Sequence, residues 1–503
     1  MSLTSVFHRY ADANPQKIAI AYGNDGWTFS EVHRLSRNIA RNLLASGAEP
    51  GDRIALHLLN GPEIALAAVG CLKAGLIAVP LNPRLKGREI DYILRHSGSA
   101  FYVGEPELYD VIAPGCPALD ELSQLYMTGP ETQSTAQFDD LLRTPPNDGA
   151  LPFVPADETA AIMYTSGTTA HPKGVVHTHG TLLETAEAVL EMHLNEDQVV
   201  IIMSSMAHMV GFGMCFTAAL ANGATTVITR PFDFENALDG FERWRGTYTL
   251  TLPVLAQCLL KMQTQRPRDL SSARFFFCGG DSVAPALQAS FARAIAPICE
   301  VYGATEIAPS CWNRPGEIRV GSIGQPSDGV QFRVVGPQGL EVPHGSVGEI
   351  HMRGPHLTTG YWRDPESTGA AFHDGWFRSG DLAMRDKDGF YWFAGRKKEI
   401  IVRGGSNISP QEVEAALCEH PAVAEAGVVG EKDPLWGEIV VAHVALSPGR
   451  RIDEQELIAF ARERLADYKV PATVVFHSEL PKGTTGKIQR RALREERVLN
   501  AAS

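Results

Sequence analysis

The stretch "AAIMYTSGTTAHPKG", Ala160–Gly174, joins an apolar strand to a loop rich in hydroxyl groups. "AAIMYTS" is typical of a buried strand, so the loop follows at its carboxyl end. Open α/β sheets bind ligands at that end. Freed backbone N–H groups and hydroxyls can surround phosphate oxygens, and Lys173 can add a positive charge. The stretch therefore predicts an α/β protein with a phosphate-binding loop made of Thr165, Ser166, Gly167, Thr168, Thr169 and Lys173.

The loop does not match the Walker A pattern. Pro172 precedes Lys173 and Gly174 follows it, so no serine or threonine comes next to hold Mg²⁺. A standard P-loop kinase or GTPase is therefore not indicated. Taken alone, the loop could also be an ordinary Ser/Thr/Gly surface turn.

Helix and strand patterns alternate outward from this loop. A capping-box signal at Thr28 and Glu31 begins a predicted helix that ends near Gly47, and the apolar segment 63–73 predicts a buried helix. The alternation indicates α/β subdomains with largely parallel strands. We expect a loop-rich connection at 104–156 and a β-rich subdomain after about residue 325. These parts form a predicted N-terminal domain, residues 1–396, and a small mobile α+β C-terminal domain follows, residues 397–503, with helices at 410–418 and 453–464.

Composition narrows the class of protein. The chain has 503 residues and a net charge of −13, which argues weakly against a nucleic-acid partner. The eight cysteines form no C-x-x-C pair, so we expect small buried side chains in a reducing compartment rather than a zinc site. The N-terminus lacks a signal-peptide core, and Lys73 and Gly75 interrupt the most apolar segment, so no transmembrane segment is predicted. We expect a cytoplasmic protein.

Further motifs carry ligands for a nucleotide. In "YGATE", Tyr302–Glu306, the ring can stack on a purine, Thr305 can donate to a phosphate and Glu306 can hold Mg²⁺. Asp381 in "WFRSGDLA" can accept from ribose hydroxyls. The segment "GRKKEIIVRGGSNISPQEVE" begins at Gly395, and "LPKGTTGKIQR" presents Lys487 on a glycine-rich approach. Each motif alone also fits a plain turn.

In this order the motifs resemble those of the adenylate-forming superfamily, which includes acyl-CoA synthetases, firefly luciferase and the adenylation domains of peptide synthetases. The resemblance implies ATP, Mg²⁺ and CoA as ligands. It places the β- and γ-phosphates in the loop Thr165–Lys173 and Mg²⁺ on Glu306. The other implied contacts are Gly279, Gly280 and Asp281 against adenine, Tyr302 with Gly303 stacked on it, Thr305 at the α-phosphate, Asp381 and Arg396 at the ribose, Lys398 as hinge and Lys487 as catalytic lysine.

The resemblance also implies the reaction. A carboxylate attacks the ATP α-phosphate, giving an acyl-AMP and pyrophosphate, and a thiol then displaces AMP. The C-terminal domain rotates between the two steps, so that Lys487 serves the first and the segment with Gly404 and Gly405 lines the thiol channel in the second. Trp436 is expected to face the thiol substrate or to be a core residue.

The implied acid pocket lies between His208 and "YGATE". Its expected lining is apolar: His208, Met209, Val210, Gly211, Phe212, Pro253, Val254, Ile307 and Ala308. Amino-acid-activating relatives carry an aspartate near His208, and this chain has none from Ser204 to Phe216. Arg230 is the one basic residue considered nearby. We therefore expect a hydrophobic monocarboxylate, fatty or aromatic, with Gly211 and Gly213 leaving room for it. His208 is interpreted as a gate residue, and a purely structural histidine is the alternative.

Several alternatives remain open at this stage. CoA is favoured as the thiol because no carrier domain is fused to the chain, and a stand-alone enzyme that loads a carrier protein is the alternative. A catalytically inactive binding homologue is disfavoured because Thr305, Glu306, Asp381 and Lys487 are all present. Homodimerisation is left open. The basic residues Arg490, Arg491 and Arg494 could meet CoA phosphates or be solvated.

Ala170 departs from the family pattern, in which this position of the loop is usually glycine. If the residue needs a positive φ, alanine costs roughly 1 kcal/mol. We expect a modest effect on ATP affinity or loop closure, and an Ala170→Gly variant with unchanged ATP KM and kcat would show the substitution to be neutral.

Overall fold

The structure is a computed structural model that describes residues 3–129, 136–145, 149–165, 171–281, 283–403, 406–483 and 486–494. The chain divides into two compact units, one of residues 1–331 and 352–377 and the other of residues 332–351 and 378–503. Six of the eight cysteines are buried, Cys258 is half-buried and Cys418 is exposed. Within the described ranges, no helix combines the length and the apolar character needed to cross a membrane.

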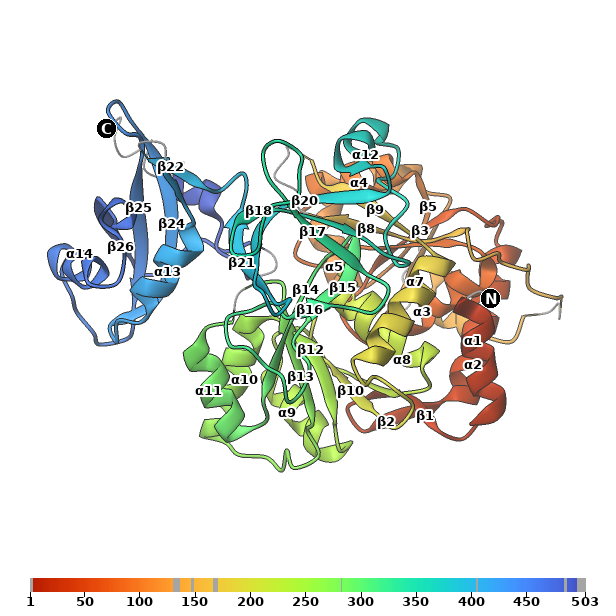
Figure 1. Cartoon of the computed structure of the whole chain (residues 1–503). Helices are drawn as coiled ribbons and strands as arrows, with labels where there is room; N and C mark the ends of the chain where they lie inside the picture. The colour runs from red at the N-terminus through yellow and green to blue at the C-terminus, as the bar shows by residue number, and fades with distance from the viewer. Residues whose placement is uncertain are drawn as a thin grey trace. The chain divides into compact units, whose positions relative to one another are not determined.

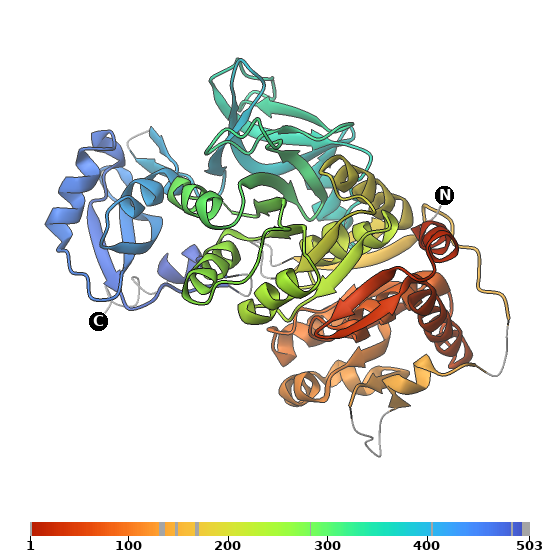
Figure 2. The ribbon, with the colours of Figure 1, turned by 90° about the horizontal axis from the view of Figure 1, so that it is seen from below.

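A nine-stranded sheet forms the centre of the first unit (Figures 1 and 2). Its inner strands run parallel and are buried on both faces, which explains their continuous apolar sequences. The edge strands β2, β15 and β16 are antiparallel. In spatial order the strands are β16 (Gln325–Pro326), β15 (Ile307–Trp312), β14 (Ile298–Ala304), β13 (Phe275–Gly279), β12 (Tyr248–Thr251), β10 (Val199–Ile202), β11 (Thr225–Ile228), β1 (Ile18–Tyr22) and β2 (Asp25–Thr28).

A seven-stranded sheet carries the loop that follows Thr165. In spatial order its strands are β7 (Ala136–Gln137), β6 (Gln124–Met127), β5 (Ser99–Gly104), β3 (Arg53–His57), β4 (Ile77–Pro80), β8 (Thr159–Thr165) and β9 (Lys173–Thr178). Strands β6 and β7, with helices α5 (Pro106–Ile112) and α6 (Phe138–Leu142), lie in the segment predicted to be loop-rich. That prediction was wrong for these elements, because short apolar stretches in proline- and glycine-rich sequence gain their stability by packing on the sheet edge.

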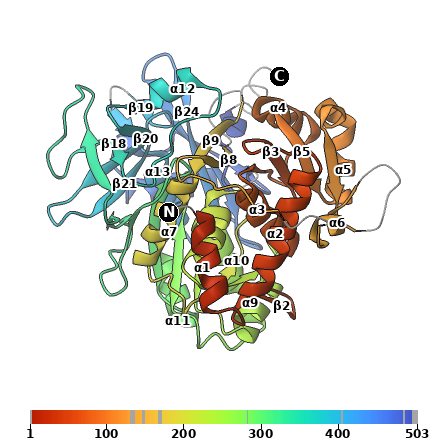
Figure 3. The same ribbon diagram turned by 90° about the vertical axis from the view of Figure 1, so that its right-hand side faces the viewer.

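Helices pack on both sheets. α3 (Pro62–Ala74) contacts strands β3 and β4 of one sheet and β1 of the other, and its side chains are buried around most of its circumference. α2 (Phe29–Ala45) begins with the predicted capping box of Thr28 and Glu31. α1 (Leu3–Ala13) packs against α2 and α7 (Figure 3). The remaining helices of this unit are α4 (Gly87–Ser97), α7 (His179–Glu191), α8 (Ala218–Ala221), α9 (Phe234–Arg243), α10 (Pro253–Gln265), α11 (Pro285–Ala294) and α12 (Pro365–Ala371).

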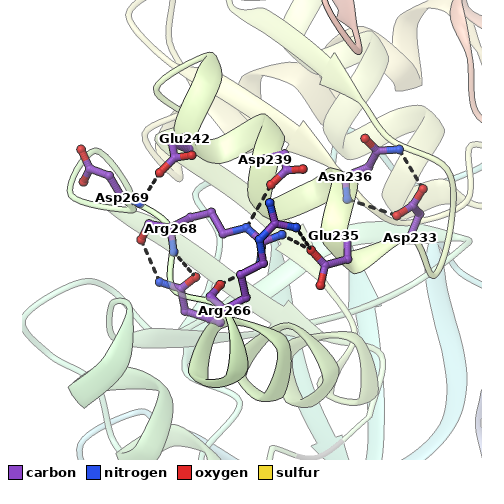
Figure 4. Close-up of polar contacts among 9 residues, drawn as sticks. Asp233, Glu235, Asn236, Asp239, Glu242, Arg266, Arg268 and Asp269 are labelled. Carbon is purple, nitrogen blue, oxygen red and sulfur yellow. Dashed lines mark hydrogen bonds and ion pairs between the residues drawn. The ribbon is translucent and has the colours of Figure 1, made fainter.

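A buried arginine ties α9 to the loop that follows α10 (Figure 4). The side chain of Arg268 is 3% exposed, and its Nε lies 2.9 Å from the Asp239 carboxylate. Its Nη2 also donates to Glu235. The backbone of Arg268 exchanges two hydrogen bonds with the Gln263 amide. The cluster thus fixes the path from α10 into β13, the strand that ends at the candidate site.

The second unit contains a β-rich part, as predicted after residue 325, and an α+β part. The β-rich part comprises β17 (Gln331–Val335), β18 (Val347–Arg353), β20 (Trp376–Arg385) and β21 (Tyr391–Arg396). The short strand β19 (Phe372–His373) belongs to the first unit and pairs with Trp376 and Phe377, the first two residues of β20, which also fall in that unit. The α+β part is a sheet covered by the two predicted helices α13 (Pro410–Cys418) and α14 (Glu454–Arg462). Its strands are β23 (Ser406–Ile408), β22 (Ile401–Arg403), β25 (Gly437–Leu446), β24 (Val423–Asp433) and β26 (Thr473–His477).

The compact units group residues 378–396 with the C-terminal part, whereas the sequence analysis placed them in the N-terminal domain. A division by packing and a hinge for rotation are different properties. The boundary at 396/397 therefore stays a prediction.

Candidate active site

The predicted phosphate loop connects two strands of an antiparallel hairpin. Strands β8 and β9 pair so that Thr165 lies opposite Lys173. Ser166, Gly167, Thr168, Thr169 and Ala170 lie outside the described residues. A strand thus follows the loop, where a Walker A motif has a helix. This architecture agrees with the failure of the Walker pattern in the sequence.

"YGATE" forms a second hairpin, between β14 and β15. Ala304 pairs with Ile307, so Thr305 and Glu306 occupy the turn. Tyr302 is 9% exposed and lies opposite Cys311. A Cβ on Gly303 would lie 2.9 Å from the Cβ of Ala308, so only glycine permits this close approach of the two strands. The hairpin therefore presents the predicted phosphate and metal ligands side by side.

A third segment, Thr358–Trp362, contacts both hairpins. The N–H of Trp362 donates to the Gly174 carbonyl at 2.8 Å, and the N–H of Thr358 donates to the Glu306 carbonyl at 2.8 Å. The hydroxyl of Tyr361 donates to Glu306 Oε1 at 2.7 Å. The Lys173 ammonium lies 4.7 Å from the centre of the same tyrosine ring. The fold thus brings together Lys173 and Glu306, which are far apart in the sequence, through a tyrosine that the sequence analysis missed.

Two buried histidines support the second hairpin. His177 Nε2 lies 2.9 Å from the Thr305 carbonyl, and His356 Nε2 lies 2.8 Å from the Pro309 carbonyl. Because a carbonyl only accepts, both rings carry a proton on Nε2. Burial lowers the pKa of each ring to about 4, so both are neutral at pH 7. His177 thus acts as a fixed donor to the turn, and His356 as a fixed donor to β15.

The predicted adenine segment lies at the end of β13. A Cβ on Gly279 would lie 2.1 Å from the Val301 carbonyl, and Gly280 has φ +79°, so both positions require glycine. Asp281 is exposed, and Ser282 lies outside the described residues. The Glu300 carboxylate accepts from the backbone N–H of Val283 and so anchors the far end of this segment.

His208 lies against a residue that the sequence analysis missed. The Asn82 amide Nδ2 lies 3.3 Å from His208 Nε2. The Asn82 Oδ1 accepts from the Arg84 N–H at 3.0 Å, which fixes the orientation of the amide. Asn82 therefore donates to His208 Nε2, and the neutral ring carries its proton on Nδ1. The asparagine follows β4 in "PLNPR", a stretch with no chemical signal of its own.

The glycines of the predicted acid pocket serve packing. They lie in a π-helix, Val210–Thr217, a form often found at functional sites. A Cβ on Gly211 would lie 2.3 Å from the Ser205 carbonyl, and one on Gly213 would lie 2.5 Å from the Met209 sulfur. The side-chain directions of both glycines are thus filled by neighbouring atoms, and the expectation that they leave room for substrate stays a prediction.

The other predicted pocket residues differ in burial. Met209, Phe212, Ile307 and Ala308 are buried, whereas Val210, Pro253 and Val254 are half-buried. Arg230 donates to the Tyr22 hydroxyl at 3.1 Å. Since this arginine is engaged by a tyrosine of β1, it does not alter the expectation of an uncharged pocket.

The second unit carries the predicted ribose ligands on paired strands. Asp381 of β20 lies opposite Arg396 of β21, and the carboxylate lies 3.4 Å from the guanidinium. The Glu349 carboxylate lies nearby and accepts hydrogen bonds from His351 and Lys397. These bonds, chiefly the one from His351, lower the pKa of the Glu349 carboxyl to about 2. Lys398 is exposed directly after this pair of strands. The predicted ribose ligands thus lie on one hairpin, and the predicted hinge residue follows it by two positions.

Lys487 lies on a tight turn. The N–H of Gly483 donates to the Lys487 carbonyl at 2.7 Å, and Gly486 has φ +82°. Arg490 pairs with Glu414 at 2.7 Å and with Glu399 at 3.0 Å. The alternative of a solvated side chain was therefore wrong for Arg490, because Glu414 of α13 and Glu399 hold its guanidinium and its side chain is 17% exposed. The alternative of a contact with CoA phosphates stays a prediction.

Of the residues predicted to line the thiol channel, the structure describes Trp436 but not the two glycines. Gly404 and Gly405 lie outside the described residues. Trp436 is 48% exposed at the turn between β24 and β25, and the Arg403 guanidinium lies 5.6 Å from its ring centre. The tryptophan is thus a surface residue, and the alternative of a core tryptophan was wrong.

Comparison with known proteins identifies the family. The family model for AMP-binding enzymes matches residues 7–362, and the model for their C-terminal domain matches residues 412–487. This chain belongs to the AMP-binding enzyme family. The feruloyl-CoA synthase of Amycolatopsis sp is 36% identical over 97% of each chain. The medium-chain fatty-acid–CoA ligase of Escherichia coli (strain K12) is 33% identical over 98% of this chain and 90% of its own. The crystal structure of the anthranilate CoA ligase AuaEII in complex with anthranoyl-AMP covers 100% of this chain and 98% of its own, with a TM-score of 0.94 and 28% identity.

Two residues of this AMP-binding enzyme lie at the candidate site although no sequence motif indicated them. Tyr361 and Asn82 each contact a residue that the motifs did single out, Glu306 and His208. A weak signal existed for Tyr361, since "GYW" follows a run of turn residues. Pairing between segments that are distant in the chain is what makes these contacts, and no spacing rule predicts it.

Proposed function

We propose that this AMP-binding enzyme activates an aromatic carboxylic acid and transfers it to CoA. The protein is an ATP-dependent acid–CoA ligase that works through an acyl-AMP. In the first step a carboxylate oxygen attacks the α-phosphorus of ATP, the bond to the β-phosphate oxygen breaks and pyrophosphate leaves. In the second step the CoA sulfur attacks the acyl carbon, its proton is lost and AMP leaves.

The first step needs cationic groups and donors around the developing negative charge. Lys173 and the hydroxyl loop would hold the β- and γ-phosphates, and Thr305 would donate to the α-phosphate. Glu306 suits Mg²⁺, because its carboxylate stands at an accessible hairpin turn and is held by a tyrosine hydroxyl. The metal ion would neutralise phosphate charge when bound. Lys487 would reach the carboxylate and α-phosphate from the second unit.

Adenine and ribose contacts would complete ATP binding. Gly279, Gly280 and Asp281 would lie against the adenine and Tyr302 would stack on it, with Gly303 allowing the close approach. Asp381 and Arg396 would hold the ribose hydroxyls. The paired geometry of the last two residues supports this assignment, since the carboxylate can accept while the guanidinium fixes it.

The second step would use a different face of the C-terminal residues. We infer rotation about Lys398, after which Gly404 and Gly405 would line the pantetheine channel and the exposed Trp436 would face the thiol substrate. A hinge at an exposed lysine after a rigid strand pair fits this role. The cytoplasmic location and the oligomeric state stay predictions.

The observation that favours an aromatic acid is the filled space beside Gly211 and Gly213. A long alkyl chain needs a continuous channel, and these two glycines do not open one in their side-chain directions. A ring needs only a short flat pocket with apolar walls, which Met209, Phe212, Ile307 and Ala308 would supply. The feruloyl-CoA synthase and the anthranilate CoA ligase, both similar to this chain, are named for aromatic acids.

A substrate panel tests the proposal. The purified protein is incubated with ATP, Mg²⁺ and CoA and with arylpropenoic, arylacetic, benzoic and straight-chain acids of 6–12 carbons, and pyrophosphate, AMP and thioester are measured. We expect kcat/KM for the preferred aromatic acid to exceed that of each alkyl acid by roughly 10-fold or more, the difference that one well-fitted pocket contributes. Preference for an alkyl acid would overturn the aromatic proposal. Pyrophosphate release without CoA thioester would instead indicate a carrier protein as the acceptor.

A further inference from the structure

We propose that Tyr361 is a positioning residue that holds the metal ligand Glu306 and the phosphate-loop lysine Lys173 in one cluster, and thereby sets how strongly Mg²⁺ supports ATP binding. The inference deepens the proposed function and depends on the roles given there to Glu306 and Lys173. It concerns a residue that lies in neither of their motifs. The supporting observation is that the Tyr361 side chain contacts Glu306 through its hydroxyl and Lys173 through its ring.

The backbone fixes the place of Tyr361. Its segment pairs with β9, because the N–H of Val176 donates to the Gly360 carbonyl at 3.0 Å and Val175 and Tyr361 form an antiparallel bridge. The N–H of Tyr361 donates to the Thr368 hydroxyl at 3.0 Å. The segment therefore extends the phosphate-loop hairpin by one strand-like piece. Tyr361 has little freedom to leave the cluster.

The side chain then makes two contacts. The hydroxyl donates to Glu306 Oε1 at 2.7 Å, a charge-assisted bond that holds the carboxylate in one rotamer. The ring centre lies 4.7 Å from the Lys173 ammonium, within the range of a cation–π contact. The Phe372 ring packs edge-on against the tyrosine ring at 5.8 Å between centres. Rotation of the tyrosine would break both polar contacts together.

The two contacts have separable consequences. A carboxylate held in one rotamer loses less conformational freedom when it binds a cation, so the hydroxyl should favour Mg²⁺ binding with ATP. The ring keeps the lysine at the mouth of the phosphate loop, so it should favour the nucleotide even without the metal ion. Tyr361→Phe removes the first contact and keeps the second. Tyr361→Leu removes both.

The experiment measures equilibrium binding of ATP to the full chain by calorimetry, without acid or CoA, over a Mg²⁺ series and in excess EDTA. For Tyr361→Phe we expect the Mg²⁺ concentration for half-maximal enhancement of ATP binding to rise about 10-fold, as for loss of one hydrogen bond to a charged group, with ATP binding in EDTA unchanged. For Tyr361→Leu we expect the same rise and also roughly 3-fold weaker ATP binding in EDTA.

A matched control distinguishes loss of the Tyr361–Glu306 contact from a general loss of stability. Tyr102→Phe also removes a buried tyrosine hydroxyl, which lies 2.8 Å from His57 Nδ1 on the neighbouring strand. It should lower the Tm and leave the Mg²⁺ dependence of ATP binding as in the wild type. If Tyr361→Phe leaves the Mg²⁺ series unchanged while wild type shows one, the inference about Tyr361 is wrong and the proposed function stands. If wild type binds no ATP at any Mg²⁺ concentration, the proposed function fails, and the inference fails with it.

Discussion

Arg490 lies three residues after Lys487, and its guanidinium is 2.7 Å from the Glu414 carboxylate of α13. A second carboxylate, Glu399, lies 3.0 Å away and directly follows Lys398, the predicted hinge residue. The segment with the predicted catalytic lysine is thus tied both to a helix and to the segment of the predicted hinge. We therefore expect Arg490 to position Lys487 through the backbone.

Weakening the ion pairs of Arg490 with Glu414 and Glu399 should slow adenylation more than thioester formation. We expect Arg490→Lys to lower the rate of pyrophosphate release about 10-fold, because a lysine cannot form the two-pronged pair with Glu414. Thioester formation from supplied acyl-AMP and the KM for CoA should change little. A double-mutant cycle with Glu414→Gln should show coupling between the two sites. A raised KM for CoA with normal pyrophosphate release would mean that Arg490 binds CoA phosphates after all.

Lys487 itself should separate the two half-reactions. Lys487→Ala should slow adenylation by about 100-fold or more, since a positive charge at the transition state is lost. The variant should still convert supplied acyl-AMP and CoA to thioester. Lys482→Ala is the matched control on the same turn, because Lys482 pairs with Glu425 at 2.7 Å. Equal loss of both steps in Lys487→Ala would contradict the rotation of the C-terminal domain.

Glu300 should make stability depend on pH with an unusual sign. Burial raises the pKa of its carboxyl from 4.5 to about 7, and the Gln288 amide donates to it at 2.7 Å. The folded state holds the Glu300 proton more tightly than the unfolded state does, so protonation of Glu300 stabilises the fold. This contribution to the free energy of unfolding is complete below pH 4.5 and is lost as pH rises through 7. Among the described residues, the buried Gln288 Oε1 has no hydrogen-bond partner, and a protonated Glu300 could donate to it once the amide turns.

Thermal unfolding of Glu300→Gln against wild type checks this. The variant should gain stability relative to wild type as pH rises from 5 to 8, at up to about 1.4 kcal/mol per pH unit. Glu349→Gln is the opposite case, because the pKa of Glu349 is lowered to about 2 and its contribution is lost only as pH falls below 4.5. The Glu349 carboxyl itself should therefore contribute no slope from pH 5 to 8. A flat profile for Glu300→Gln would show that this carboxyl titrates normally.

The Arg268 cluster should matter for stability and not for chemistry. Arg268→Met leaves Glu235 and Asp239 without their buried partner, and both carboxylates can turn toward solvent, so we expect a loss of about 2 kcal/mol in unfolding free energy. Arg266→Met is the control, because the Arg266 side chain also pairs with Glu235 but is 71% exposed. It should cost less than about 1 kcal/mol. Urea titrations measure both, and similar losses would show that burial of Arg268 is unimportant.

Local sequence determined much of this protein. The helix cap at Thr28 and Glu31, the apolar strands of both sheets and the helix Pro410–Cys418 follow from patterns within one element, where each residue interacts with near neighbours. The order of five motifs was enough to predict the family and the reaction. The segment 104–156 was misjudged because its short strands have no stability apart from the sheet edge that pairs with them.

Tertiary structure alone decided how the motifs are supported. Tyr361 bridges Glu306 and Lys173, Asn82 fixes the ring of His208, and Glu399 and Glu414 hold Arg490, all across long distances in the chain. Gly211 and Gly213 were expected to shape a substrate pocket, and the fold uses them for the close packing of a π-helix. The physical reason is the same in each case. A motif specifies the groups that react, whereas rotamers, tautomers and free space depend on neighbours that only the folded chain supplies.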